Sequence, residues 1–290
     1  MWTALPLFSS RFDVQFEVAD ALSGGRWANL QLLYVEDDTA AKEHLDFELP
    51  DLLLLDFSDP AIQAFALVAH IENDPWLLSG GIIAICDDTA TEKKINALQG
   101  LNVVYCIRSQ RIGAELAHLL GIVYRNKRLI SHLGLGADIV SRISASYELS
   151  NDLLEARCYA NMISNFLYNA GACDGRQKGE LRLALTELLL NGIEHGNCEI
   201  SFEDKSAWLE AGKDIGDLVE ERNAQPKIAA RRVRLDYSVR PDTLHFSITD
   251  AGAGFDWKAQ LERAEEPEIM FLEHGRGIAM TRGCTQNLSF

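Results

Sequence analysis

Residues 1 to about 108 alternate five short apolar runs with segments of helical periodicity. Such alternation is typical of strand-helix-strand units, whose strands pair in parallel and whose helices cover the sheet. The expected strands are Ala4–Phe8, Leu30–Val35, Leu52–Asp56, Gly81–Cys86 and Asn102–Cys106. The sequence therefore predicts an α/β fold whose N-terminal part is a doubly wound parallel sheet.

Five strands of this kind favour a flavodoxin-like order, in which ligands bind beyond the carboxyl ends of the strands. Asp56 ends the most apolar strand, and Asp59-Pro60 follows it closely. This segment resembles the third strand of a response-regulator receiver domain. The resemblance implies that Asp56 stands at the phosphoacceptor position.

The other positions of a receiver site are poorly matched. Receivers have an acidic pair after the first strand to hold Mg2+, a Ser or Thr after the fourth strand and a Lys after the fifth. Here the corresponding residues are Ser9 and Ser10, Cys86, and Ile107-Arg108, while the acidic pair Asp37 and Asp38 follows the second strand. A carboxylate without metal ligands or a cation is a poor phosphate acceptor, because nothing neutralises the charge that develops. We therefore expect a receiver-like module that is not phosphorylated.

The C-terminal half contains three separated polar patches. The first lies on an expected amphipathic helix, Leu181–Gly192, where Glu187 and Asn191 are four residues apart and share a face, with His195 four residues further on. A carboxylate beside an amide oxygen is a plausible ligand set for Mg2+, which favours oxygen donors.

The second and third patches are rich in glycine. Asp250-Ala-Gly-Ala-Gly254 follows an expected strand, Leu244–Asp250, and its glycines allow the backbone to approach a flat ligand. Gly275-Arg-Gly277 precedes an expected helix, where free N–H groups and the positive end of the helix dipole favour phosphate oxygens. The three patches together predict an ATP site.

In this order, the patches resemble the N, G1 and G2 boxes of the GHKL (Bergerat-fold) ATPases, the fold shared by Hsp90, DNA gyrase, MutL and histidine kinases. The segment Glu187-Leu-Leu-Leu-Asn191-Gly-Ile-Glu-His195-Gly196 looks most like the N box of bacterial anti-sigma factor serine kinases. The resemblance covers roughly residues 145–290. It implies an α/β sandwich that binds Mg-ATP.

The resemblance also implies a role for each matched residue. Glu187 would be the general base that accepts a proton from water or from a partner's serine hydroxyl. The implied nucleotide and metal contacts are Asn191 to Mg2+, Asp250 to the adenine amino group, Gly252 and Gly254 to the adenine wall, and Gly275 and Gly277 to the phosphates, with His195 and Arg276 completing the site. The implied function is a signalling serine/threonine kinase whose partner is a protein of the sigma factor or anti-sigma antagonist class.

Two other functions remain open. A non-catalytic module would bind ATP only to change the surface that it presents to a partner. A histidine kinase-related ATPase would share the same boxes, but histidine kinases have a phosphoacceptor His that is usually followed by an acidic residue. His118 and His132 are each followed by Leu, so the serine kinase is preferred.

The expected domains are 1–125, a helical connector at 126–145, and 146–290. The helical pattern of Gln110–His132 closes the first domain, and the same helix is a candidate surface for a homodimer. The C-terminal domain has an insertion at 198–226 with one or two expected helices, whose Trp208, Leu209 and Leu218 either dock a partner or pack over the domain. A second departure is Thr285–Phe290, which supplies only the beginning of the family's last strand. The lid between Phe255 and His274 is long and charged.

Composition limits the partners and the compartment. The formal net charge of −16 disfavours a general role on nucleic acid, which needs a basic surface, so proteins are the expected partners. No apolar run approaches the length of a membrane span, and the first residues lack the features of a signal peptide. We therefore expect a cytoplasmic protein, in which the six scattered cysteines are thiols.

Overall fold

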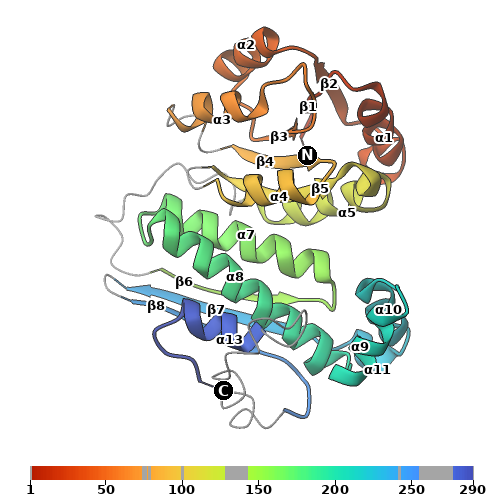
Figure 1. Ribbon diagram of the computed structural model, residues 1–290, viewed down its shortest axis with the longest axis vertical. Helices are drawn as coiled ribbons and strands as arrows, with labels where there is room; N and C mark the ends of the chain where they lie inside the picture. Colours follow the sequence, from red (N-terminus) through yellow and green to blue (C-terminus); the bar gives the residue numbers. More distant parts are fainter. Residues whose placement is uncertain are drawn as a thin grey trace. The chain divides into compact units, whose positions relative to one another are not determined.

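The computed structural model describes residues 2–73, 77, 80–98, 101–127, 143–240, 243–254 and 277–289. Contacts divide the chain into two compact units. The N-terminal unit comprises Met1–Leu135 and Asn161–Ala170, and the C-terminal unit comprises Gly136–Ala160 and Gly171–Phe290. Each unit has its own sheet (Figure 1).

The N-terminal sheet has five parallel strands in the order β2-β1-β3-β4-β5. The strands are β1 (Ala4–Phe8), β2 (Gln31–Val35), β3 (Leu52–Asp56), β4 (Gly81–Cys86) and β5 (Val103–Arg108). These bounds agree with the expected strands to within two residues. The predicted α/β architecture with a parallel sheet is confirmed for this unit.

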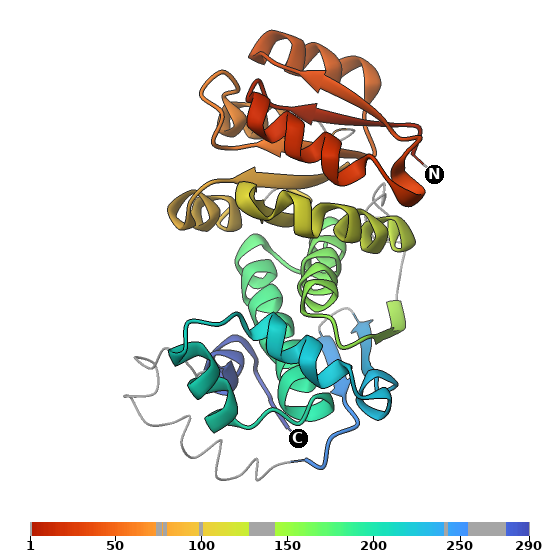
Figure 2. The same ribbon diagram turned by 90° about the vertical axis from the view of Figure 1, so that its right-hand side faces the viewer.

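Helices cover both faces of this sheet (Figure 2). The helices are α1 (Phe12–Leu22), α2 (Asp38–Glu48), α3 (Ala64–Glu72), α4 (Thr89–Asn96) and α5 (Ile112–Arg125). Side chains alternate between the faces of a strand, so Leu53 and Leu55 of β3 belong to the core formed with α2, α3 and α4. Leu54 points to the opposite face, where α1 packs against α5. All three leucines are buried, which explains why β3 reads as a continuous apolar run.

The register of the strands brings their carboxyl ends together. Phe8 pairs with Leu55, and Asp56 pairs with Ile85. The residues that follow β1 and β4 therefore lie beside Asp56. This edge of the sheet holds the polar site of the N-terminal unit.

The C-terminal sheet is antiparallel, with the order β6-β7-β8. Its strands are β6 (Ile143–Leu149), β7 (Val233–Arg240) and β8 (Thr243–Thr249). On β7 the side chains of Val233, Leu235, Tyr237 and Val239 are buried, whereas the alternate positions are exposed or half-buried. One face of this sheet therefore forms the core, and β6 includes residues 143–145, which the sequence analysis assigned to the helical connector.

Two long helices follow β6, namely α7 (Leu153–Asn169) and α8 (Gly175–Asn191). Helix α8 begins six residues earlier than the apolar pattern indicated, because Asp174 and Gln177 form a capping box at its start. A π-helical turn, Gly192–Asn197, extends its end. Helix α13 (Gly277–Cys284) packs against α8.

The insertion forms two short helices, in agreement with the one or two expected, namely α9 (Phe202–Glu210) and α10 (Ile215–Asn223). A third short helix, α11 (Pro226–Ala229), begins at the last residue of the insertion. Leu218 is buried, and the half-buried Trp208 donates its indole N–H to the carbonyl oxygen of Asp214, 2.8 Å away. The burial of Leu218 supports packing over the domain for that residue, whereas the hydrogen bond of Trp208 lies within the insertion itself.

Other expectations concern the connector, the lid and the chain end. Residues 128–142 and 255–276, which hold most of the connector and the lid, lie outside the described residues. Residues 285–289 contain no strand. Among the described residues, no helix is both long enough and apolar enough to cross a membrane.

Candidate functional site

Helix α8 carries the first polar patch of the C-terminal unit. Glu187 and Asn191 lie one turn apart near its end, and both side chains are half-buried. His195 is in the π-helical turn and is exposed, and its Nδ1 lies 2.6 Å from the carbonyl oxygen of Ile200. A carbonyl oxygen only accepts hydrogen bonds, so Nδ1 carries the proton and Nε2 is left for another partner.

The turn after β8 lies directly against the end of this helix, at two glycines. A Cβ atom on Gly196 would lie 2.3 Å from the carboxyl carbon of Asp250. A Cβ atom on Gly252 would lie 2.7 Å from the Cα of Gly196. Only residues without a side chain allow so close an approach, so the glycines bring the first and second patches together.

The carboxylate of Asp250 is exposed at this junction. Its Oδ1 accepts a hydrogen bond from the backbone N–H of Gly252 at 2.8 Å, which closes an Asx turn. Gly254 has a φ of +77°, a left-handed conformation that favours glycine. The three glycines of this region thus have two separate uses, close packing at Gly196 and Gly252 and backbone conformation at Gly254.

Asn197 fixes the same turn and was missed by the sequence analysis. It is fully buried, and its Oδ1 accepts the backbone N–H of Ala251 at 2.9 Å. Its carbonyl oxygen accepts a hydrogen bond from Arg231 Nη1 at 2.6 Å. A single asparagine after His195-Gly196 carries no motif of its own, so the sequence offered no signal for this role.

The third patch is described only in part. Gly275 and Arg276 lie outside the described residues, and Gly277 begins α13. Because α13 packs against α8, Gly277, the last residue of the third patch, and the first patch belong to neighbouring helices.

The donor set of these patches fits a nucleotide with its metal. The amide oxygen of Asn191 is a hard oxygen donor of the kind that Mg2+ prefers, with phosphate oxygens and water completing its coordination, and the carboxylate of Glu187 lies one turn away on the same helix. The exposed carboxylate of Asp250 is a hydrogen-bond acceptor suited to an amino group.

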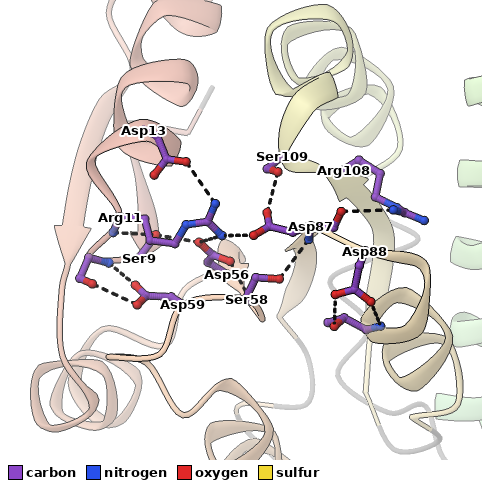
Figure 3. Close-up of polar contacts among 12 residues, drawn as sticks. Ser9, Arg11, Asp13, Asp56, Ser58, Asp59, Asp87, Asp88, Arg108 and Ser109 are labelled. Carbon is purple, nitrogen blue, oxygen red and sulfur yellow. Dashed lines mark hydrogen bonds and ion pairs between the residues drawn. The ribbon is translucent and has the colours of Figure 1, made fainter.

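The N-terminal unit has a second polar site, around Asp56 at the end of β3 (Figure 3). The side chain of Asp56 has no exposed surface. Its Oδ2 accepts a hydrogen bond from Ser9 Oγ, and its Oδ1 accepts one from the backbone N–H of Ser58, both at 2.9 Å. Burial raises the pKa of Asp56, and the bonds from Ser58 and Ser9 and the charge of Arg11 only partly oppose this rise.

Arg11 supplies the cation of this site. Its Nη1 lies 2.9 Å from Asp87 Oδ2 and 3.6 Å from Asp56 Oδ2, and its Nη2 lies 3.1 Å from Asp13 Oδ2. Figure 3 shows the guanidinium between these carboxylates. Ser109 Oγ donates to the other oxygen of Asp87 at 2.6 Å. The sequence analysis named neither Arg11 nor Asp87, although Arg11 directly follows the Ser9-Ser10 pair.

The remaining receiver positions take structural roles. Ser10 bonds to Asp59, Asp37 caps α2, and Asp38 accepts the backbone N–H of Gln63. Arg108 pairs with Glu92 at 2.7 Å. Each of these acidic or basic groups therefore has a partner other than Asp56.

Comparison with known proteins adds no assignment, because no family model and no curated protein match the chain.

Proposed function

We propose that the C-terminal unit binds Mg-ATP and transfers its γ-phosphoryl group to a serine or threonine of a partner protein, as a GHKL kinase of the anti-sigma factor type. The main support is the close approach of Asp250 and Gly252 to Gly196. It joins the first patch to the second, and the hydrogen bond beside it links Asn197 to Ala251, which are 54 positions apart in the sequence. Chance motifs have no reason to meet in this way.

In this proposal, Asp250 accepts a hydrogen bond from the adenine amino group, and Asn191 holds the Mg2+ ion. The metal would offset the charge of the phosphates. Glu187 accepts the proton of the partner's hydroxyl group while the hydroxyl oxygen forms a bond to the γ-phosphorus. The bond between the γ-phosphorus and the oxygen that bridges it to the β-phosphate breaks, and ADP leaves. Positioning and charge neutralisation provide most of the acceleration in such transfers.

Calorimetric titration of Mg-ATP and Mg-ADP into the full chain tests the nucleotide site. We expect binding to the native chain and its loss in Asp250→Asn, because the amide presents a donor where adenine needs an acceptor. Asp236→Asn is the matched control, since Asp236 is a carboxylate on the neighbouring strand β7 that pairs with Arg234. Equal binding by Asp250→Asn and Asp236→Asn would refute the assignment of Asp250.

Glu187→Gln separates catalysis from binding. We expect this variant to keep its affinity for ATP and to lose turnover, while Glu180→Gln on the same helix keeps both. Glu180 is a suitable control because it lies on α8 two turns before Glu187 and forms an ion pair with Arg176. Equal turnover in Glu187→Gln would remove Glu187 from its role, and partner capture that needs ATP but not Glu187 would favour the non-catalytic switch.

We also propose that the N-terminal unit is a receiver-like, flavodoxin-type regulatory module that is not phosphorylated. Its strand order, β2-β1-β3-β4-β5, and the position of Asp56 at the carboxyl end of β3 support the likeness. Arg11 overturns the expectation that no cation lies beside Asp56, so the lack of phosphorylation is supported instead by the burial of Asp56, whose side chain has no exposed surface to meet a phosphate donor. Incubation with labelled acetyl phosphate and Mg2+ should leave the chain unlabelled, and stable labelling that Asp56→Asn abolishes would refute this proposal.

A further inference from the structure

A chain of amide side chains connects the inserted helices to the turn that carries Asp250. The backbone N–H of Ala251 donates to Asn197 Oδ1 at 2.9 Å. Asn197 Nδ2 donates to Asn151 Oδ1 at 2.8 Å, and Asn151 Nδ2 donates to Asn223 Oδ1 at 3.0 Å. Every link runs in the same direction, so the chain is unbroken from the turn to the end of α10.

The middle of this chain is buried and further bonded. The side chain of Asn197 has no exposed surface, and Asn151 is only 6% exposed. Asn151 Nδ2 also donates to the carbonyl oxygen of Ile228, and Asn223 Nδ2 donates back to the carbonyl oxygen of Asn151, both at 2.9 Å. A buried amide that loses a partner costs more free energy than an exposed one, so these bonds resist separate rearrangement.

A second contact joins the insertion to the same end of α8. Lys205 of α9 forms an ion pair with Glu194 of the π-helical turn, and Glu194 is only 2% exposed. Both α9 and α10 therefore hold the segment Gly192–Asn197, which in turn holds Ala251. The insertion thus contacts the candidate nucleotide site through two polar connections that share no residue.

We propose that the inserted helices regulate the nucleotide affinity of the C-terminal unit through this chain. In the described arrangement, Asn223, Asn151 and Asn197 keep the Asp250 turn in its binding position. Displacement of α10 removes the two hydrogen bonds between Asn223 and Asn151, which weakens the hold of Asn197 on the Ala251 N–H and lowers the affinity for nucleotide. The regulatory role rests on the proposed function, and Asn197 acts in it as a positioning residue.

The first test is amide hydrogen exchange at Ala251, measured by NMR on the full chain without nucleotide. Asn223→Ala should accelerate this exchange roughly tenfold, because it removes one hydrogen bond of the chain. Arg222→Ala is the matched control: Arg222 is the adjacent residue of α10 and pairs with Asp204 of α9, outside the amide chain. It should leave the exchange of Ala251 unchanged.

If Asn223→Ala does not fold, Asn223→Asp replaces it. This substitution keeps an oxygen for Asn151 Nδ2 and removes the donor to the Asn151 carbonyl, and it should accelerate exchange at Ala251 by a smaller factor than the alanine variant would. Unchanged exchange in a folded variant overturns the connection, whether or not the chain binds nucleotide.

The second test measures the affinities of the same variants for Mg-ATP and Mg-GTP. A turn that misplaces Asp250 loses its contact to the adenine amino group, so Asn223→Ala should weaken ATP binding about tenfold and GTP binding much less. A purely structural effect would weaken the binding of both nucleotides equally and would overturn the regulatory role. Accelerated exchange at Ala251 with an unchanged affinity for ATP would overturn it as well. Absence of nucleotide binding in the native chain would instead refute the proposed function, and the exchange test would still decide the connection.

Discussion

The Nη1 atom of Arg11 lies 3.6 Å from the Oδ2 atom of Asp56, whose side chain has no exposed surface. The same Nη1 lies 2.9 Å from Asp87. The chain itself therefore provides a positive charge beside this buried carboxylate, held by residues that follow β1 and β4. A tethered guanidinium needs no metal to be bound, which makes the charge balance of this site independent of divalent cations.

Arg11→Ala should lower the stability of the N-terminal unit by about 3 kcal/mol, because it leaves a buried carboxylate without its cation. Hydrogen exchange of the β3 amides would measure this loss locally. Arg11→Lys keeps the charge and should lose less. In the background of Asp56→Asn, the same Arg11→Ala substitution should cost clearly less, and an equal cost in both backgrounds would contradict the pairing.

The stability of the N-terminal unit should also depend on pH through Asp56. Burial raises the pKa of Asp56 in the folded state, so the folded chain holds this proton more tightly than the unfolded chain does. The stabilisation that protonated Asp56 gives to the folded state is fully present below the unfolded-state pKa, and it is lost as the pH rises through the folded-state pKa. We expect the free energy of unfolding of Asp56→Asn, measured across the acidic range, to lack this decrease with rising pH. An unchanged dependence of the unfolding free energy on pH would show that Asp56 does not titrate in this way.

The sequence predicted the strands of the N-terminal unit well, because each strand is a short apolar run and β3 is buried on both faces. It also placed Asp56 at a carboxyl end and Ser9 beside it. Arg11 could not be found in the same way. Its role depends on the pairing of β1 with β3 and of β3 with β4, which brings Asp56 and Asp87 within reach of one guanidinium.

In the C-terminal unit, spacing alone indicated that Glu187 and Asn191 share a helical face, and the structure places both on α8. The sequence did not predict the π-helical turn after Asn191, because no local pattern distinguishes it from an α-helical one. That turn carries Gly196 and Asn197, the two residues that contact the Asp250 turn. These contacts arise from tertiary packing, which periodicity does not report.

Gly196→Ala should weaken nucleotide binding by at least about tenfold, because its Cβ atom would overlap the carboxyl group of Asp250 and displace it. Gly179→Ala is the matched control on α8, since a Cβ atom there meets nothing within 4 Å. That change should leave nucleotide binding intact and stabilise the helix by about 0.5–1 kcal/mol. Titration calorimetry and thermal unfolding of both variants would measure the two effects, and a Gly196→Ala variant with native affinity would show that the close approach is not needed for binding.

Lys205→Met should destabilise the C-terminal unit by about 3 kcal/mol, because Glu194 is buried and would lose its cation. The exposed pair of Arg222 with Asp204 provides the contrast: Arg222→Ala should cost less than about 1 kcal/mol, since water screens that pair. Denaturant unfolding of the two variants measures both losses. Adding Glu194→Gln to Lys205→Met should recover part of the lost stability, because a neutral amide is less costly to bury than an unpaired carboxylate. No recovery in the double variant would mean that Lys205 stabilises α9 by packing its alkyl chain and not by neutralising Glu194.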